Sequence, residues 1–189
     1  MTAKKQPEIR VRIAPSPTGN LHIGTARTAL FNWLFVKHHG GKFILRIEDT
    51  DLERSEKKFD KDIIESLLWL GINWEEGPFR QSERLDIYEK YINKLLKNGT
   101  AYYCFCTKEE LETERQAMLS QGLAPKYSGK CRTFTADRRG SSIIRFKIPE
   151  TKITFKDLIR GEITFDTILL GDIAIAKNSR TPLYNFAVV

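Results

Sequence analysis

The first half of the chain alternates between strand-like and helix-like patterns of hydrophobic positions. The pattern predicts a strand, an apolar helix and a second strand over residues 8–14, 26–38 and 42–48. In the second strand Phe43, Leu45 and Ile47 share one face, and Gly40 and Gly41 supply the helix stop before it. Because strand–helix–strand crossovers are right-handed, the two strands are predicted to be parallel, with ligands at their carboxyl ends.

Two further helices are predicted by apolar residues at helical spacing. They cover residues 55–70, ending at Gly71, and residues 83–97, ending at Asn98. We interpret the large aromatic residues on these helices as core or boundary residues without a ligand role, namely Trp69, Tyr88 and Tyr91.

The second half of the chain has a different texture. Thr107 and Glu110 read as a capping box that opens a helix through Met118, and residues 122–140 read as a basic loop. Short apolar runs separated by polar turns cover residues 102–105, 143–148, 153–155, 163–165 and 173–176. The sequence therefore predicts an α/β protein in which a small α/β insertion follows the first strands and helices.

The segment between the first strand and the first helix has the features of a phosphate-binding loop. It reads Arg-Ile-Ala-Pro-Ser-Pro-Thr-Gly-Asn-Leu-His-Ile-Gly-Thr over residues 12–25. Pro15 and Pro17 stiffen it, and Gly19 and Gly24 permit close approach of the backbone to a ligand. His22 lies where a helix begins, and the free N–H groups there favour phosphate oxygens. The alternative is an ordinary connector with a capping histidine.

This loop, together with Arg-Ile-Glu-Asp-Thr-Asp at residues 46–51, resembles the HIGH-motif region of class I aminoacyl-tRNA synthetases, specifically the bacterial-type glutamyl enzymes. The last position of the motif is Thr25 instead of histidine. The resemblance extends from Arg12 to Val189. It implies the first half of a class I Rossmann-like fold over residues 1–100, an inserted acceptor-binding, zinc-type subdomain over 101–180, and a return to the catalytic domain over 181–189.

The resemblance also implies roles for individual residues. The catalytic residues would be His22, Gly24 and Thr25. ATP would contact the HIGH-type region at Pro15, Ser16, Pro17, Thr18, Gly19, His22, Ile23, Gly24 and Thr25. The substrate glutamate would contact Arg12, Ala14, Ser16, Glu48 and Tyr184.

The chemistry of these side chains suits an amino acid with an acidic side chain. The guanidinium of Arg12 can form a bidentate pair with a carboxylate, and the carboxylate of Glu48 can accept hydrogen bonds from an ammonium group. For the nearby Asp49 and Asp51 an acidic turn before the next helix is an equally good interpretation.

The charge balance is basic, since 31 Lys and Arg against 24 Asp and Glu give a formal net charge of +7. This suits a polyanionic partner, although such a balance is also common among small soluble proteins. The candidates for tRNA contact, which could equally form a solvated rim, are Lys126, Lys130, Arg132, Arg138 and Arg139.

Three cysteines, an odd number, argue against a disulfide framework and leave metal binding or inert burial. Cys104, Cys106 and Cys131 provide three of the four ligands that a zinc site needs. The resemblance offers Tyr127 as the fourth, while Thr133 stands where some family members have histidine. The expected role of Zn²⁺ is structural.

The activity implied is ATP-dependent ligation of L-glutamate to tRNA(Glu) through glutamyl-adenylate, with Mg²⁺. No lysine-rich KMSKS loop occurs and the chain stops in an apolar run, so we expect a truncated catalytic portion. The alternatives are a non-catalytic ATP- or tRNA-binding fragment and an enzyme like the glutamyl-queuosine tRNA(Asp) synthetases. No signal or membrane-spanning run is visible, so we expect a cytoplasmic protein, monomeric when full length.

Overall fold

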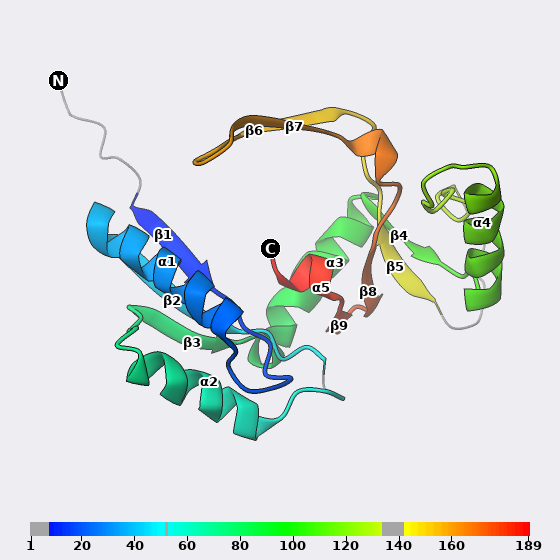
Figure 1. The fold of residues 1–189 in the computed structure, drawn as a ribbon. Helices are drawn as coiled ribbons and strands as arrows, with labels where there is room; N and C mark the ends of the chain where they lie inside the picture. Colours follow the sequence, from blue (N-terminus) through cyan, green and yellow to red (C-terminus); the bar gives the residue numbers. More distant parts are fainter. Residues whose placement is uncertain (1–7, 52, 134–141) are drawn as a thin grey trace. The chain divides into compact units, whose positions relative to one another are not determined.

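The computed structural model of the chain describes residues 8–51, 53–133 and 142–189. It folds as two compact units, residues 1–84 and residues 85–189, which are drawn together in Figure 1. The first unit holds a parallel sheet with helices and the second is mainly antiparallel, so the predicted α/β class is confirmed. The domain boundaries at residues 100 and 180 stay a prediction.

The first unit is a three-stranded parallel sheet with strand order β1-β2-β3. The predicted parallel pairing of the first two strands is therefore confirmed. The third strand escaped prediction because its residues, Glu-Gly-Pro-Phe-Arg, show no hydrophobic alternation. The elements in chain order are β1 (Ile9–Ile13), α1 (Ile23–His39), β2 (Gly41–Ile47), α2 (Lys57–Trp69), β3 (Glu76–Arg80) and the 3-10 turn η1 (Gln81–Arg84).

The core of the first unit forms on β2. Phe43, Leu45 and Ile47 are at most 1% exposed and pack with Ile63 and Leu67 of α2. This is the face that the alternation of β2 predicts. Burial of this face fixes the register of β2, because a slip by one residue would turn these side chains to solvent.

The second unit combines a four-stranded antiparallel sheet, with strand order β4-β5-β8-β9, and a two-stranded ribbon. Its hydrophobic core lies between α3 and this sheet, around Ile92, Ile144 and Ile175. No helix in the described residues is long and apolar enough to cross a membrane. The elements are α3 (Leu85–Lys97), β4 (Ala101–Cys104), α4 (Lys108–Ser120), β5 (Ile143–Phe146), β6 (Lys152–Asp157), β7 (Gly161–Asp166), the 3-10 turn η2 (Thr167–Leu169), β8 (Ala174–Asn178), β9 (Thr181–Pro182) and α5 (Tyr184–Ala187).

Local sequence signals have mixed success. The capping box is present: the Thr107 hydroxyl accepts from the Glu110 N–H, and the Glu110 carboxylate accepts from the Thr107 N–H. Tyr88 is 9% exposed, as expected of a core residue, whereas Trp69 is 86% exposed and the interpretation as a core or boundary residue is wrong. Trp69 is the last residue of α2, where the buried stripe of that helix has already ended at Leu67.

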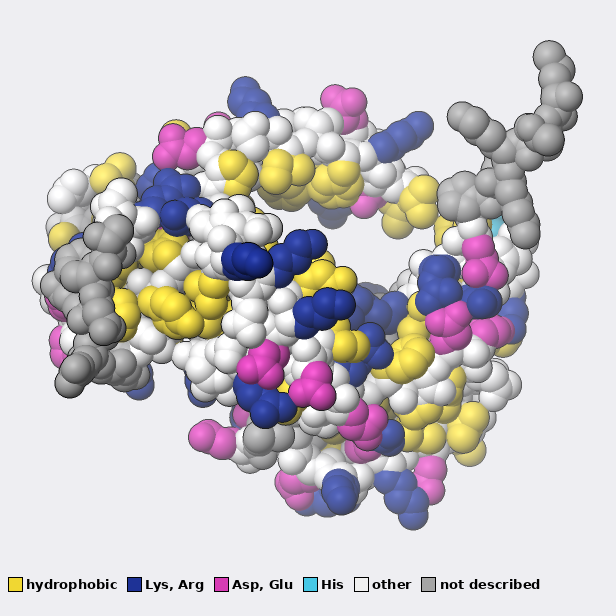
Figure 2. Space-filling view, turned by 180° about the vertical axis from the view of Figure 1, so that it is seen from behind, with side chains coloured by type: hydrophobic (Ala, Val, Ile, Leu, Met, Phe, Trp, Pro, Cys, Tyr) yellow, Lys and Arg dark blue, Asp and Glu magenta, His cyan; other side chains and the backbone are white. Residues whose placement is uncertain are grey.

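The ribbon of β6 and β7 has one apolar face. Ile153 pairs with Phe165 and Phe155 pairs with Ile163, so the four side chains lie on the same side of the ribbon. The rings of Phe155 and Phe165 are stacked with their centroids 6.0 Å apart. Figure 2 shows a row of hydrophobic side chains along the ribbon.

Candidate functional site

The loop between β1 and α1 is held by backbone hydrogen bonds from two other segments. The N–H of Glu48, directly after β2, donates to the Pro15 carbonyl at 2.9 Å, and the N–H of Glu56 donates to the Pro17 carbonyl at 3.0 Å. Both prolines are buried. The loop is therefore fixed at the carboxyl ends of β1 and β2, where ligands bind in folds of this kind.

His22 caps α1 and is bonded to the first turn of its own helix. Its Nδ1 accepts from the Gly24 N–H at 3.1 Å, and its Nε2 lies 3.1 Å from the Thr25 Oγ1. In a neutral imidazole an accepting Nδ1 leaves the proton on Nε2, which then donates to Thr25. A Cβ at position 24 would lie 3.0 Å from the His22 ring, so glycine at this position leaves room for the ring. The structure brings these three predicted catalytic residues together.

Glu48 is a buried acidic residue whose backbone N–H is bonded to this loop. Its side chain is 6% exposed, and its Oε1 accepts from Arg46 Nη2 at 2.8 Å. Arg12 lies in β1, and Ala14 and Ser16 follow that strand. These predicted glutamate ligands of the first unit therefore gather around the ends of two adjacent parallel strands.

Tyr184, the fifth predicted glutamate ligand, begins the short helix α5 of the second unit. Its side chain is 62% exposed. A joint site of Tyr184 with residues of the first unit stays a prediction.

The residues that support the loop carry no local sequence signal. Asp62 of α2 accepts from the Leu21 N–H at 2.7 Å, forty-one positions away in sequence, so no local motif contains it. Arg46 belongs to a motif of the sequence, but the motif does not predict that Arg46 pairs with Glu48. The acidic turn interpretation suits Asp51, whose carboxylate accepts from Arg54 at 2.6 Å; this hydrogen bond lowers the pKa of Asp51.

A cavity of about 640 Å³ opens beside the carboxyl ends of β2 and β3. Its lining includes Asp49, which accepts from the Ser82 N–H at 2.8 Å, and the ion pair of Arg80 with Asp60 at 2.8 Å. Among the predicted ligand residues only Pro17 lines this cavity. The cavity therefore does not coincide with the predicted glutamate site.

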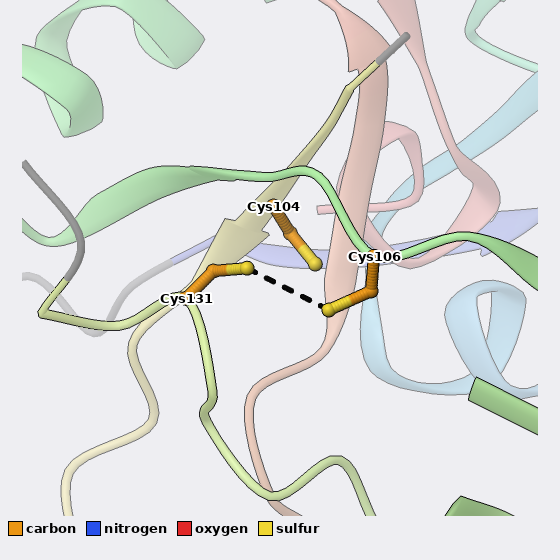
Figure 3. Close-up of side chains that lie close together, drawn as sticks. All are labelled: Cys104, Cys106 and Cys131. Carbon is orange, nitrogen blue, oxygen red and sulfur yellow. Dashed lines mark hydrogen bonds between the residues drawn. The ribbon is translucent and has the colours of Figure 1, made fainter. Parts of the chain in front are cut away.

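The three cysteines form one cluster in the second unit. Cys104 ends β4, Cys106 follows it, and Cys131 lies in the loop after α4 (Figure 3). Their sulfur atoms all lie within 4.8 Å of one another, and those of Cys106 and Cys131 are 3.6 Å apart. The structure thus joins two segments that are separated by twenty-four residues in the sequence.

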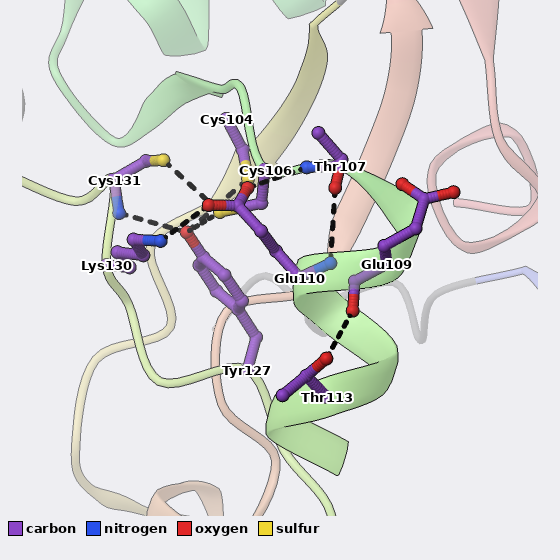
Figure 4. Close-up of polar contacts among 9 residues, drawn as sticks. All are labelled: Cys104, Cys106, Thr107, Glu109, Glu110, Thr113, Tyr127, Lys130 and Cys131. Atoms are coloured by element: carbon purple, nitrogen blue, oxygen red, sulfur yellow. Dashed lines mark hydrogen bonds and ion pairs between the residues drawn. The ribbon is translucent and has the colours of Figure 1, made fainter. Parts of the chain in front are cut away.

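Tyr127 adds an oxygen to this cluster. Its Oη lies 3.4 Å from the Cys104 Sγ and 3.5 Å from the Cys106 Sγ (Figure 4). The same Oη accepts from the Cys131 N–H at 2.9 Å. We call these four side chains, Cys104, Cys106, Tyr127 and Cys131, the S3O cluster.

Three of the donor–donor distances in the S3O cluster match those around a tetrahedral zinc ion. Zinc bonds of about 2.3 Å to sulfur and 2.0 Å to oxygen place neighbouring sulfurs about 3.8 Å apart and sulfur and oxygen about 3.5 Å apart. The closest sulfur pair and the two sulfur–oxygen distances, 3.6, 3.4 and 3.5 Å, are close to these values. Cys104 and Cys131 are buried, which is typical of a closed structural site.

Burial also sets the protonation of the cluster. It raises the pKa of the Cys106 thiol to about 11 and, with the neighbouring sulfurs, raises the pKa of the Tyr127 phenol. Burial opposes ionisation of Cys131 as well, but hydrogen bonds with Tyr127 and the Phe105 backbone lower its pKa overall. A metal ion that binds here therefore displaces protons.

The basic candidates for tRNA contact mostly have partners within the protein. Arg138 and Arg139 lie outside the described residues, and RNA contact by the whole set stays a prediction. Lys126 donates to the Ile168 carbonyl at 2.8 Å, Lys130 pairs with Glu110 at 2.8 Å, and Arg132 donates to the Ile148 carbonyl at 2.9 Å.

The parallel sheet and the histidine-capped loop together define the catalytic domain of a class I aminoacyl-tRNA synthetase. The family model described as "tRNA synthetases class I (E and Q), catalytic domain" matches residues 8–189, and the chain belongs to this family.

Among the curated relatives are glutamate–tRNA ligase 1 of Caldicellulosiruptor saccharolyticus and the glutamate–tRNA ligase of Nostoc punctiforme, both 55% identical over 96% of this chain. The match spans 41% and 40% of their own lengths. A crystal structure of a glutamate tRNA ligase from Elizabethkingia meningosepticum, in complex with its amino acid, has a TM-score of 0.83 and 38% identity; the match covers 96% of this chain and 41% of that one.

Proposed function

We propose that this chain is the N-terminal catalytic portion of a glutamate–tRNA ligase. In the complete enzyme the α-carboxylate of glutamate attacks the α-phosphate of ATP, which gives glutamyl-adenylate and pyrophosphate, and the glutamyl group then passes to the 3′ end of tRNA(Glu). The observation that carries the proposal is the fixed loop of residues 14–22 with His22 at the start of α1, in a chain that belongs to the class I family.

In this proposal Arg12 and Glu48 recognise the two charged groups of glutamate that do not react, the side-chain carboxylate and the ammonium group. The Arg12 guanidinium pairs with the side-chain carboxylate of glutamate. The Glu48 carboxylate accepts hydrogen bonds from the substrate ammonium group, while Arg46 holds one of its oxygens at 2.8 Å. Tyr184, Ala14 and Ser16 complete the pocket.

The phosphates of ATP are oriented by backbone N–H groups at the start of α1 and by His22. Catalysis of an in-line displacement rests on positioning and on stabilisation of charge, so no side-chain nucleophile is required. Rotation of the His22 ring away from Thr25 would free its Nε2–H for a phosphate oxygen. Mg²⁺ would offset the negative charge of the phosphates.

The test is glutamate-dependent exchange of pyrophosphate into ATP, with and without tRNA, by this chain and by a chain extended to the length of its relatives. We expect activity in the extended chain. Glu48→Gln should raise the KM for glutamate, and the control Asp51→Asn, in the neighbouring acidic turn, should not. Absence of exchange in the extended chain with tRNA present would contradict the proposal.

The same assay separates the ligase from the glutamyl-queuosine alternative. A tRNA(Glu) transcript made in vitro carries no modified bases, so glutamate attached to it can only be at its 3′ end, as expected of the ligase. The alternative enzyme would leave this transcript uncharged and would require a queuosine-containing tRNA(Asp).

We further propose that the S3O cluster binds Zn²⁺ with a structural role. Its donor set and its spacing support this, and a closed tetrahedral site supplies folding energy without an open position for chemistry. Metal analysis of the purified chain should find one zinc per chain. Zinc retained at wild-type affinity in Tyr127→Phe would remove Tyr127 from the proposed ligand set.

A further inference from the structure

Arg145 is a buried cation that the proposed reaction does not use. It lies in β5 of the second unit and is 8% exposed. Its guanidinium carbon lies 3.9 Å from the centroid of the Tyr127 ring, and its Nη1 donates to the Asp172 carbonyl at 2.8 Å. Within the described part of the chain its Nε is buried without a hydrogen-bond partner. Burial of a guanidinium with so few hydrogen bonds is costly. This cost indicates that Arg145 has a role beyond its hydrogen bond with Asp172.

Asp172 gives this guanidinium a fixed support. Its carboxylate is 4% exposed and accepts from the Tyr102 hydroxyl at 2.7 Å and from the Ile148 N–H at 2.9 Å. The residue before it, Gly171, packs so closely that an added Cβ would lie 3.0 Å from the Tyr127 carbonyl oxygen. The Asp172 segment therefore lies against the backbone of Tyr127 while its carbonyl holds Arg145.

Tyr127 itself needs such a support. It belongs to a stretch between α4 and β5 that forms neither helix nor strand in its described part, so no ladder of backbone hydrogen bonds fixes it. At the far end of its ring the Cys131 N–H holds the Oη at 2.9 Å. A desolvated cation over the ring face is attracted to the π-electrons of the ring, and it restricts rotation of the ring.

We propose that Arg145 is a positioning residue of the S3O cluster. Its guanidinium stacks on the Tyr127 ring and keeps the Oη directed at the sulfurs of Cys104 and Cys106. The inference rests on the proposed zinc site and adds a residue that supplies no ligand atom. Groups that orient a metal ligand commonly change metal affinity by about 10- to 100-fold when they are replaced.

Two substitutions separate the two contacts of Arg145. Arg145→Gln keeps an N–H donor for the Asp172 carbonyl but removes the charge above the ring, whereas Arg145→Lys keeps the charge. Lys147→Met is the matched control, because Lys147 also lies over a tyrosine, with its Nζ 5.8 Å from the ring of Tyr102, outside the S3O cluster.

The measurement is zinc affinity by competition with a chromophoric chelator, alone and in a double-mutant cycle with Tyr127→Phe. We expect Arg145→Gln to weaken zinc binding by about 10-fold or more. Arg145→Lys should retain most of the affinity, and Lys147→Met should stay within about two-fold of wild type. In the Tyr127→Phe background Arg145→Gln should add no further loss.

The Co²⁺-substituted chain supplies a second readout, independent of affinity and of folding yield. The visible absorption of four-coordinate Co²⁺ reports its ligands, so the Arg145→Gln spectrum should shift towards that of Tyr127→Phe. Arg145→Lys should keep the wild-type spectrum. The same comparison decides the matter if Arg145→Gln yields little protein.

The outcomes distinguish failure of this inference from failure of the zinc proposal. Equal losses for Arg145→Gln with and without Tyr127, or an equal loss for Lys147→Met, would show that Arg145 supports the fold and not the ligand. Wild-type affinity and spectrum in Arg145→Gln would also overturn the inference. A wild-type chain that binds no zinc would overturn both proposals together.

Discussion

The phosphate loop of the first unit and the S3O cluster of the second are built in opposite ways. The loop is one continuous stretch of sequence, and its central side chain, His22, is exposed and bonded to the first turn of its own helix. The cluster joins Cys104 and Cys106 to Tyr127 and Cys131 from another segment, and two of its thiols are buried. An exposed site suits a ligand that comes and goes, and a closed one suits a permanent ion.

If the S3O cluster binds zinc as proposed, removal of the zinc should have the largest effect on the second unit among the changes considered in this section. Structural zinc in zinc-finger peptides contributes about 10–16 kcal/mol of binding free energy. We expect Cys131→Ser, or strong chelation of the wild type, to abolish slow amide exchange in β4 and around residues 127–131. Hydrogen exchange with mass spectrometry measures this.

The strand β2 of the first unit is the internal control for that experiment, and its amides should stay protected. Thr133→Ala is the control variant, since Thr133 stands near the cluster in sequence and is not a proposed ligand. If chelation leaves β4 as protected as β2, the cluster is a set of inert buried thiols and the comparison fails.

In the first unit the experiment comparable to zinc removal is a substitution in the hydrophobic core, which has no proposed metal site. Phe43 is 0% exposed and lies at the centre of the sheet face that packs on α2. Phe43→Ala should lower the free energy of unfolding of the first unit by about 3–5 kcal/mol, through lost burial and the cavity that remains. Urea unfolding followed by hydrogen exchange in β1 and β2 would measure the loss.

Zinc binding should be unaffected by this substitution, because Phe43 packs in the core of the first unit, whereas the cysteines belong to a separate hydrophobic cluster of the second unit. Loss of zinc from Phe43→Ala would show that the two units unfold together, and the comparison would have to be made for the whole chain.

The two sites also differ in how far the sequence predicts them. The glycines, prolines and His22 of the loop act on their immediate neighbours, so their spacing is enough to predict a stiff turn with His22 at the start of a helix. The supports of the loop were out of reach, because Asp62 meets Leu21 only after α2 packs against it. The strand β3 was missed for a related reason, since its pairing with β2 is tertiary and leaves no alternating pattern.

For the S3O cluster the sequence supplied the donors but not their arrangement. The spacing of the three thiols favours a metal site over inert buried cysteines but does not show how the donors meet. The position of the Tyr127 Oη, 3.4 Å from the Cys104 Sγ, favours the metal. Arg145 and Asp172 carry no metal-ligand signal at all, because their part depends on how β5 and the segment before β8 pack on Tyr127.

A smaller effect distinguishes the two tasks of His22. His22→Ala removes the cap of α1 and should lower stability by about 1 kcal/mol, whereas His22→Asn supplies another good cap and should retain it. Both variants lack the imidazole, so both should slow pyrophosphate exchange by the extended chain by about 100-fold. Thermal unfolding and the exchange assay measure the two effects separately. Full exchange activity in His22→Asn would reduce His22 to a capping residue.

The smallest expected effect concerns two ion pairs of Glu76, which link the three strands of the first unit at the surface. Glu76 of β3 accepts from Arg10 of β1 at 2.8 and 2.6 Å and lies 3.1 Å from the Lys42 Nζ of β2. The hydrogen bond with Arg10, followed by that with Lys42, lowers the pKa of Glu76 to about 2.

Because the pKa of Glu76 is lowered in the folded state, its ionised form stabilises the fold above the usual carboxyl pKa. That contribution fades as the pH falls from about 4.5 through about 2. Glu76→Gln should therefore shift the urea midpoint slightly downwards at pH 7, and the difference from wild type should shrink towards pH 3. The exposed Glu53→Gln is the control and should show no such convergence. A difference that stays constant between pH 7 and pH 3 would mean that Glu76 acts through packing. The ion pairs of Glu76 would then not stabilise the sheet.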